Sequence, residues 1–278
     1  MVKVKEIFYE MKPFLNTYVF EIKQQKRKFI IFSVLSALIC VLTNFILENA
    51  FPESSLANNL MEYLRGGVGF VTLLVLFGSC FFFSGIICSE FSTKTGFVVF
   101  PKINKYKLIF GKYFGNLTLI IGVIAIYYLI LGLLGLYFYT GPIPVQFFYS
   151  FGICIIYIIM LSAFVTFFSS FMKSVNITII STILILLIVF QIVDQIIVLL
   201  NKDFEPLYSF NYLSGLISEI IQERFPTKLS DRYQDIVMER FAFRQWITPS
   251  IEMGISMMLL YTVLFLGLAS IIFKRKQL

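Results

Sequence analysis

Asp194 is the one acidic residue that lies well inside an apolar stretch of the chain, so it is the first candidate for chemistry. Gln191 lies three residues before Asp194 and four before Gln195, which puts the three side chains on one face of a helix. Such a carboxylate can act at the outer gate of a substrate pathway, or it can pair with a base from a neighbouring loop. The candidate bases are Arg65, Arg240 and Arg244, and both roles remain open.

Most other chemistry is excluded by what the sequence lacks. It has no histidine, which rules out histidine-based zinc sites and acid–base catalysis by imidazole. It has no phosphate-binding loop of the G-x-x-x-x-G-K-[ST] type and no intramembrane carboxylate pair. The four cysteines, Cys40, Cys80, Cys88 and Cys154, lie in or beside apolar stretches, where packing is their expected role. We therefore expect no catalytic residues, no enzyme, and no metal or cofactor bound by the chain itself.

Composition indicates one all-α integral membrane domain covering residues 1–278. The chain is 58% hydrophobic and only 14% charged, whereas soluble domains carry about 25% charged residues. A helix needs about 20 apolar residues to cross a bilayer. Charge-free runs of that length predict six spans, at residues 29–48, 67–88, 114–137, 147–172, 176–200 and 251–273.

The basic residues predict the orientation of these spans in the cell membrane. Lysine and arginine collect in residues 1–28, in the 89–112 loop, at Lys173 and in the tail after residue 273. These segments all fall on one side, which the positive-inside rule makes the cytoplasm. Both termini are then cytoplasmic, and the net charge of +7 faces anionic lipid, with no indication of nucleic acid as a partner.

Residues 1–28 carry the pattern of an amphipathic elbow helix. Pro13 suits a first helical turn. After it, apolar residues recur at helical spacing, at Phe14, Leu15, Tyr18, Val19 and Ile22, with Glu21 opposite them and Arg27 following. We expect a helix that lies along the cytoplasmic interface and then turns into the first span. It either anchors the chain or also contacts a partner.

The 201–250 segment predicts an extracellular helical loop. One helical pattern runs from Phe210 to Ile221, and a second contains Tyr233, Ile236, Val237 and Phe241. Thr248 and Pro249 fit an N-cap and first-turn proline that open the last span. Trp246 fits an interfacial aromatic residue.

Small residues predict close helix contacts. Gly111 and Gly115 have the G-x-x-x-G spacing, and Ser162, Thr166 and Ser169 form a stripe along the fourth span. Residues of these kinds favour helix packing, and the stripe also admits a substrate path.

The loop at 89–112 combines a short apolar stretch, residues 97–100, with several lysines. Ser92 or Thr93 can cap a short helix, and Pro101 ends it. Glu90 is expected to hold the end of the second span at the interface. The loop fits either a handle for a soluble protein or aromatic residues that dip among lipid headgroups beside snorkelling lysines.

The loop resembles that of permease subunits of ABC-2-type ATP-binding-cassette transporters, especially archaeal members. The similarity is carried by Glu90, by Lys94-Thr95-Gly96, by Phe97 to Phe100 with Pro101, and by Gly111-Lys112. Many members have an arginine shortly after the proline, where this chain has Lys102, Lys105 and Lys107.

The resemblance implies the six-span, type V-like exporter topology of that family. It also implies a second permease chain, identical or related, and a separate ABC ATPase that binds ATP and magnesium. The residues expected to contact the ATPase are Glu90, Thr93, Lys94, Thr95, Gly96, Phe97, Phe100, Pro101 and Lys105. Spans 1, 2 and 5 would line the path. The alternative is a membrane anchor or scaffold for a cytoplasmic partner, without transport of its own.

Overall fold

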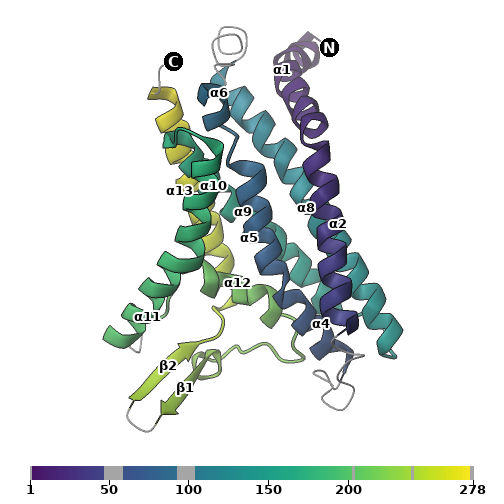
Figure 1. Cartoon of the computed structure of the whole chain (residues 1–278), viewed down its shortest axis with the longest axis vertical. Helices are drawn as coiled ribbons and strands as arrows, with labels where there is room; N and C mark the ends of the chain where they lie inside the picture. Colours follow the sequence, from purple (N-terminus) through teal and green to yellow (C-terminus); the bar gives the residue numbers. More distant parts are fainter. Residues whose placement is uncertain (1, 47–58, 93–103, 202–203, 239–240, 276–278) are drawn as a thin grey trace.

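The computed structural model describes residues 2–46, 59–92, 104–201, 204–238 and 241–275 (Figure 1). In these residues six helical stretches are long and apolar enough to cross a membrane, which confirms a mostly helical, multi-pass membrane protein. They are Lys26–Asn44, Leu60–Ser92, Lys105–Phe138, Val145–Phe171, Val175–Ile197 and Ile251–Arg275. The second and third stretches begin at residues 60 and 105, earlier than the predicted 67 and 114, because both helices include charged residues that the apolar count stopped at.

The first half of the chain forms α1 (Val2–Gln24), α2 (Lys26–Val41), a π-helical turn (Leu42–Ile46), α4 (Leu60–Gly69), α5 (Val71–Phe83), α6 (Cys88–Ser92), α8 (Lys105–Phe138) and α9 (Val145–Phe171). The second half forms α10 (Val175–Leu184), a π-helical turn (Ile185–Val189), α11 (Phe190–Leu200), α12 (Phe210–Glu219), a 3-10 turn (Leu229–Arg232), β1 (Tyr233–Met238), β2 (Phe241–Trp246) and α13 (Ile251–Arg275). Helices α4, α5 and α6 together make the second span.

The bundle has two distinct ends (Figure 1). The start of α1, the end of α13, α6 and the start of α8 lie at one end, which we name the terminus end. Helices α4 and α12 and the two strands lie at the other end, which we name the hairpin end. The start of the first helix and the end of the last helix therefore lie at the same end of the bundle.

Helix α1 lies along α8 because two glycines of α8 let it approach closely. A Cβ added at Gly111 would meet the Thr17 Cβ at 2.8 Å, and one at Gly115 would meet the Glu21 Cβ at 3.1 Å. The G-x-x-x-G pair is thus a seat for the first helix, and Thr17 and Glu21 are buried against it.

This contact corrects the prediction for the elbow. The helix starts at Val2, so Pro13 lies inside it and not in its first turn. Only Gln25 separates α1 from α2, and α1 leads directly into α2 beside α8, without a turn along a surface (Figure 1). Because the α8 glycines form its seat, α1 buries a face that includes Glu21, while Leu15 and Val19 are exposed.

An aromatic cluster joins α12 to the spans. The Phe210 side chain of α12 is buried, with its ring centroid 5.0 Å from that of Phe164 in α9 and 4.9 Å from that of Phe190 in α11. Phe265 of α13 contacts Phe164 at 5.1 Å. The first helical pattern of the 201–250 segment is therefore confirmed, as a helix that caps the core.

The prediction of a second helix in that segment is wrong. Strands Tyr233–Met238 and Phe241–Trp246 form an antiparallel pair in which Tyr233 lies opposite Trp246 and Asp235 opposite Arg244. Aromatic and β-branched residues favour strands, and a cross-strand ion pair adds to the pairing, with Arg244 Nε 2.9 Å from Asp235 Oδ1. The last span begins at Ile251, where the amide of Gly254 donates to the Ser250 carbonyl, so Thr248 does not occupy the predicted cap position.

A leucine in place of Gly115 should displace α1 from α8. The added side chain would overlap the backbone carbonyl of Tyr18, 3.2 Å from the new Cβ, and overpacking of this kind costs about 1–3 kcal/mol. We expect Gly115→Leu to lower the thermal unfolding temperature of the purified chain. Gly152→Leu is the control, because nothing lies within 4 Å of a Cβ at that position. Equal unfolding temperatures for the two variants would contradict the seat.

Candidate functional site

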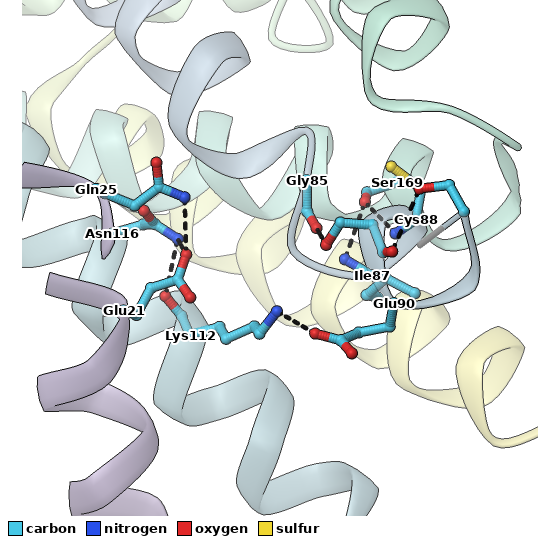
Figure 2. A network of polar contacts seen from close by, with 11 residues as sticks. Glu21, Gln25, Gly85, Ile87, Cys88, Glu90, Lys112, Asn116 and Ser169 are labelled. Carbon is cyan, nitrogen blue, oxygen red and sulfur yellow. Dashed lines mark hydrogen bonds and ion pairs between the residues drawn. The ribbon is translucent and has the colours of Figure 1, made fainter. Parts of the chain in front are cut away.

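A buried ion pair joins the two helices that flank residues 93–103. The Lys112 ammonium of α8 contacts the Glu90 carboxylate of α6 (Figure 2), and the residues are only 9% and 6% exposed. Glu90 lies in the last turn of the second span, as predicted, and this ion pair fixes it to α8. The lysine that was predicted to open the third span lies inside α8, and from there it reaches the acid.

Ser169 of α9 holds the break between α5 and α6. Its hydroxyl donates to the Ser84 carbonyl at 2.7 Å and accepts from the amides of Ile87 and Cys88, both at 3.1 Å. These bonds satisfy backbone groups that the interruption of the helix would otherwise leave unpaired in an apolar environment. The short α6 is thereby fixed to α9 on one side and to α8 on the other (Figure 2).

A second polar contact fixes α8 to α1. The Asn116 amide nitrogen donates to Glu21 Oε1 at 3.0 Å and to the Lys112 carbonyl at 3.1 Å. Gln25 donates to the same Glu21 oxygen at 3.0 Å. Glu21 and Asn116 are both buried, and Figure 2 shows Asn116 and Lys112 on the same stretch of α8, with Glu21 of α1 beside them. We call the six residues Glu21, Gln25, Glu90, Lys112, Asn116 and Ser169 the polar network.

Through the polar network, α8 contacts both α1 and α6 at the terminus end. Helix α8 has 34 residues, which at about 1.5 Å per residue is about 51 Å, longer than the hydrocarbon core of about 30 Å. The same stretch of α8 holds α1 through Asn116 and α6 through Lys112. A displacement of α6 would therefore be passed to α8 and then to α1.

The predicted ATPase-coupling residues are only partly within the described chain. Glu90 belongs to the polar network, and Lys105 begins α8 with its ammonium 5.6 Å from the centroid of the Phe273 ring of α13. Thr93, Lys94, Thr95, Gly96, Phe97, Phe100 and Pro101 lie outside the described residues. The two described residues bracket the segment and tie both of its ends to the bundle.

Three of the four elbow residues face the bundle. Phe14 makes an edge-to-face contact with Phe114 at 6.2 Å between ring centroids. The Tyr18 and Thr118 hydroxyls are 3.1 Å apart, and Ile22 is packed against the core. Arg27 is exposed. The sequence pattern missed Glu21, because an acid opposite an apolar stripe is normally solvated. Asn116, a single amide within a long apolar run, was the available signal for its partner.

At the hairpin end, Gln191, Asp194 and Gln195 line one cleft of about 590 Å³, which we name the outer cleft. The prediction that the three share a helix face is confirmed, since α11 presents all three to this space. The other lining residues come from the 201–250 segment: Pro206, Asn211, Tyr212, Arg244, Gln245, Trp246 and Ile247.

Asp194 does not pair with either of the candidate bases that the structure describes. Its Oδ2 accepts from the Ser209 hydroxyl at 2.6 Å. Arg65 instead binds Glu219, with its Nη2 2.7 and 2.6 Å from the two carboxylate oxygens, and Arg244 binds Asp235. Arg240 lies outside the described residues. The predicted ion pairs with Arg65 and Arg244 are therefore wrong, because each arginine has an acid closer at hand.

Further polar contacts join residues of the 201–250 segment to one another beside the outer cleft. Arg232 Nη1 lies 3.1 Å from Glu205 Oε1, and the Tyr212 hydroxyl donates to the same oxygen at 2.8 Å. Burial and this carboxylate raise the pKa of Tyr212 above its usual range. Burial and the nearby Asp194 carboxylate raise the pKa of Tyr208 in the same direction. Both phenols remain neutral donors at physiological pH.

The hydroxyl stripe of the fourth span lies in the core. Ser162 donates to the Ile158 carbonyl at 2.6 Å, and Thr166 donates to the Ser162 carbonyl at 2.7 Å. Ser162, Thr166 and Ser169 are all fully buried. These contacts support helix packing as the role of the stripe.

Comparison of the chain with models of known protein families finds no match, and a comparison with curated protein sequences finds none either. A function for this chain therefore has to be inferred from its sequence pattern and from the geometry of the polar network and the outer cleft.

Removing one partner of the buried ion pair should cost more than removing both. Glu90→Leu leaves the Lys112 ammonium buried without its counter-ion, which typically costs about 3–5 kcal/mol. The double variant Glu90→Leu with Lys112→Met should recover most of that loss, because apolar replacements of a buried pair are often nearly neutral. Thermal or denaturant unfolding of the purified chain measures both.

Lys173→Met is the control for this cycle. Lys173 is exposed at the loop between α9 and α10, where a substitution changes stability by less than about 0.5 kcal/mol. If the double variant is as unstable as the sum of its single changes, the two side chains do not act as a pair.

Proposed function

We propose that the chain is the permease subunit of an ABC-2-type transporter in the cell membrane. In this proposal a separate ABC ATPase binds ATP and magnesium and supplies the energy. The permease pairs with a second permease chain, identical or related, and moves a substrate outward. The chain contributes no nucleotide site or catalytic group of its own.

The observation that carries the proposal is the buried ion pair between Glu90 and Lys112. It joins the last residues before 93–103 to the helix that comes after them, inside the bundle. A loop that only rested among lipid headgroups would gain little from this link, because the desolvation cost of a buried ion pair offsets most of its stabilisation. A loop that receives force from a partner needs such a connection to the spans.

The arrangement of basic residues supports a cytoplasmic terminus end. Lys105 opens α8, whose start lies at this end. The last turn of α13 has Lys274 and Arg275. Helix ends that are far apart in sequence thus bring their positive charges to the end where the partner is expected, as the positive-inside rule requires.

The proposed coupling begins at residues 93–101. ATP binding moves the ATPase, and the movement passes through Glu90 to Lys112 and along α8. The spans then shift between inward-open and outward-open states. For this to drive transport, the substrate must bind the two states with different affinity.

The exposed spans give a second chain and a substrate room to bind. Helix α2 and the span that contains α10 and α11 bury only a small part of their surface within the single chain. With α5 they are the spans that the resemblance assigns to the path. A dimer would cover part of these surfaces and enclose the path.

The proposal predicts that charges on the 97–100 stretch break the partner contact. Phe97→Asp and Phe100→Asp should abolish co-purification of the ATPase and ATP-driven transport, because a carboxylate cannot enter an apolar groove without a large desolvation cost. Lys173→Asp, an exposed change in another loop at the terminus end, is the control and should keep both. Normal binding and turnover of the ATPase in the two phenylalanine variants would refute a coupling role.

The double variant Glu90→Leu with Lys112→Met separates a permease from a scaffold. Under the permease proposal the ATPase still binds this variant, but transport per ATP hydrolysed falls, because the link between α6 and α8 is lost. A parent chain that binds the ATPase yet never moves a substrate in reconstituted vesicles would instead favour the scaffold.

A further inference from the structure

We propose that the outer cleft is a binding site for the ammonium headgroup of an amphiphile, with Asp194 as its counter-ion. The cleft has a volume of about 590 Å³, within the range of about 300–1,000 Å³ that is usual for small-molecule sites. It opens beside α11, so a ligand in it has its head against polar side chains and its tail against the span.

The first argument is the unsatisfied carboxylate. Asp194 Oδ2 is held by Ser209, whereas Oδ1 is buried and has no hydrogen-bond partner among the described residues. The neighbouring Tyr208 hydroxyl interacts with this carboxylate, but not with the geometry of a normal hydrogen bond. An unmet acceptor of this kind costs about 1–3 kcal/mol, and more when the group is charged. An ammonium satisfies it with both charge and donors, because it has three N–H groups and no acceptor.

The second argument is the charge of the lining. Among the lining residues that the structure describes, Arg244 is the only base, and its guanidinium is bound to Asp235 and stacked 3.8 Å from the centroid of the Tyr233 ring. The remaining polar side chains are the neutral amides of Gln191, Gln195, Asn211 and Gln245. The uncompensated charge that faces the cleft is therefore the negative charge of Asp194, which disfavours anionic headgroups.

The third argument is Trp246. Its indole lines the cleft and is fixed by edge-to-face contacts with Tyr212 at 6.4 Å and Tyr233 at 5.3 Å. An indole face is the most favourable of the aromatic surfaces for a cation. Its Nε1 is buried and has no hydrogen-bond partner among the described residues.

The apolar tail of the ligand is accommodated by the neighbouring face of α11. Ile192 and Ile196 are about half exposed, and they come one residue after Gln191 and Gln195 respectively. The helix thus places a polar face in the cleft beside an apolar face outside it. This pairing selects an amphiphile over a small hydrophilic ammonium compound.

The binding site rests on the cleft alone, whereas its use as a station on an export path rests on the proposed permease function. The test therefore uses the purified chain without any ATPase, so that failure of binding and failure of ATPase coupling are distinguishable.

Trp246 is the only tryptophan of the 278 residues, so its fluorescence reports on the cleft directly. The chain is placed in phosphatidylglycerol nanodiscs, whose lipid has no ammonium headgroup and whose scaffold protein is a tryptophan-free variant. It is titrated with decylammonium or with the neutral analogue decanol. We expect a saturable emission change with decylammonium and none with decanol. Asp194→Asn should weaken the apparent affinity at least tenfold, equivalent to about 1.4 kcal/mol.

Two variants keep the test decisive. Asp231→Asn removes a carboxylate of the outer segment that does not line the cleft, and it should titrate like the parent. Asp194→Glu keeps the charge, and it should keep the preference for decylammonium over decanol even if Asp194→Asn fails to fold. The proposal is overturned if the decylammonium response does not saturate, if decanol gives the same response, or if Asp194→Asn titrates like the parent.

A final arm identifies the source of the ammonium. With phosphatidylethanolamine in the nanodiscs, competition against decylammonium assigns the cleft to a membrane lipid. An unchanged titration assigns it to a free ammonium amphiphile. Both results require the saturable, Asp194-dependent response described above.

Discussion

The ion pair between Glu90 and Lys112 is the contact on which the terminus end depends, because it places two full charges inside an apolar bundle. Neither charge is tolerable alone at such burial, so each fixes the position of the helix that carries the other. The break at residues 84–87 and the start of α8 at Lys105 are both set relative to this pair. Replacing it with apolar side chains would preserve the burial but would lose the directional link.

The polar network extends this constraint to the first helix. Gly111 and Gly115 remove the side chains that would separate α1 from α8, and Asn116 then reaches the Glu21 carboxylate. Lys112 lies between these residues on α8 and holds α6. Within two turns of one helix, backbone approach, an amide–carboxylate bond and an ion pair join three segments. We expect these polar contacts to transmit a displacement between helices better than contacts between methyl groups do.

How far the sequence predicts this structure depends on whether a feature is local. Six spans follow from charge-free length alone, and α12 follows from its apolar period after Ser209, which caps it through a bond to the Tyr212 amide. The strands at 233–238 and 241–246 were predicted as a helix because a short run of recurring apolar residues fits both the helical and the strand period. The pairing of Asp235 with Arg244 in the structure distinguishes the two. The contact of Glu90 with Lys112 and that of Glu21 with Asn116 depend on which helices pack together. The spacing of residues within one helix does not give this information.

The outer cleft shows the same limit. The shared face of Gln191, Asp194 and Gln195 was predictable from their spacing, but the partner of Asp194 was not, since nothing in the sequence allows a choice among Arg65, Arg240 and Arg244. The structure assigns Arg65 to Glu219 and Arg244 to Asp235, and Asp194 keeps a neutral hydroxyl instead. Arg65 and Arg244 lie near the same end of the bundle, so a base was at hand if pairing this carboxylate were the only requirement. Among the described residues, one oxygen of Asp194 and the indole N–H of Trp246 have no hydrogen-bond partner, although both residues line the same cleft. This is costly for stability alone, and it is explained if a ligand satisfies the carboxylate.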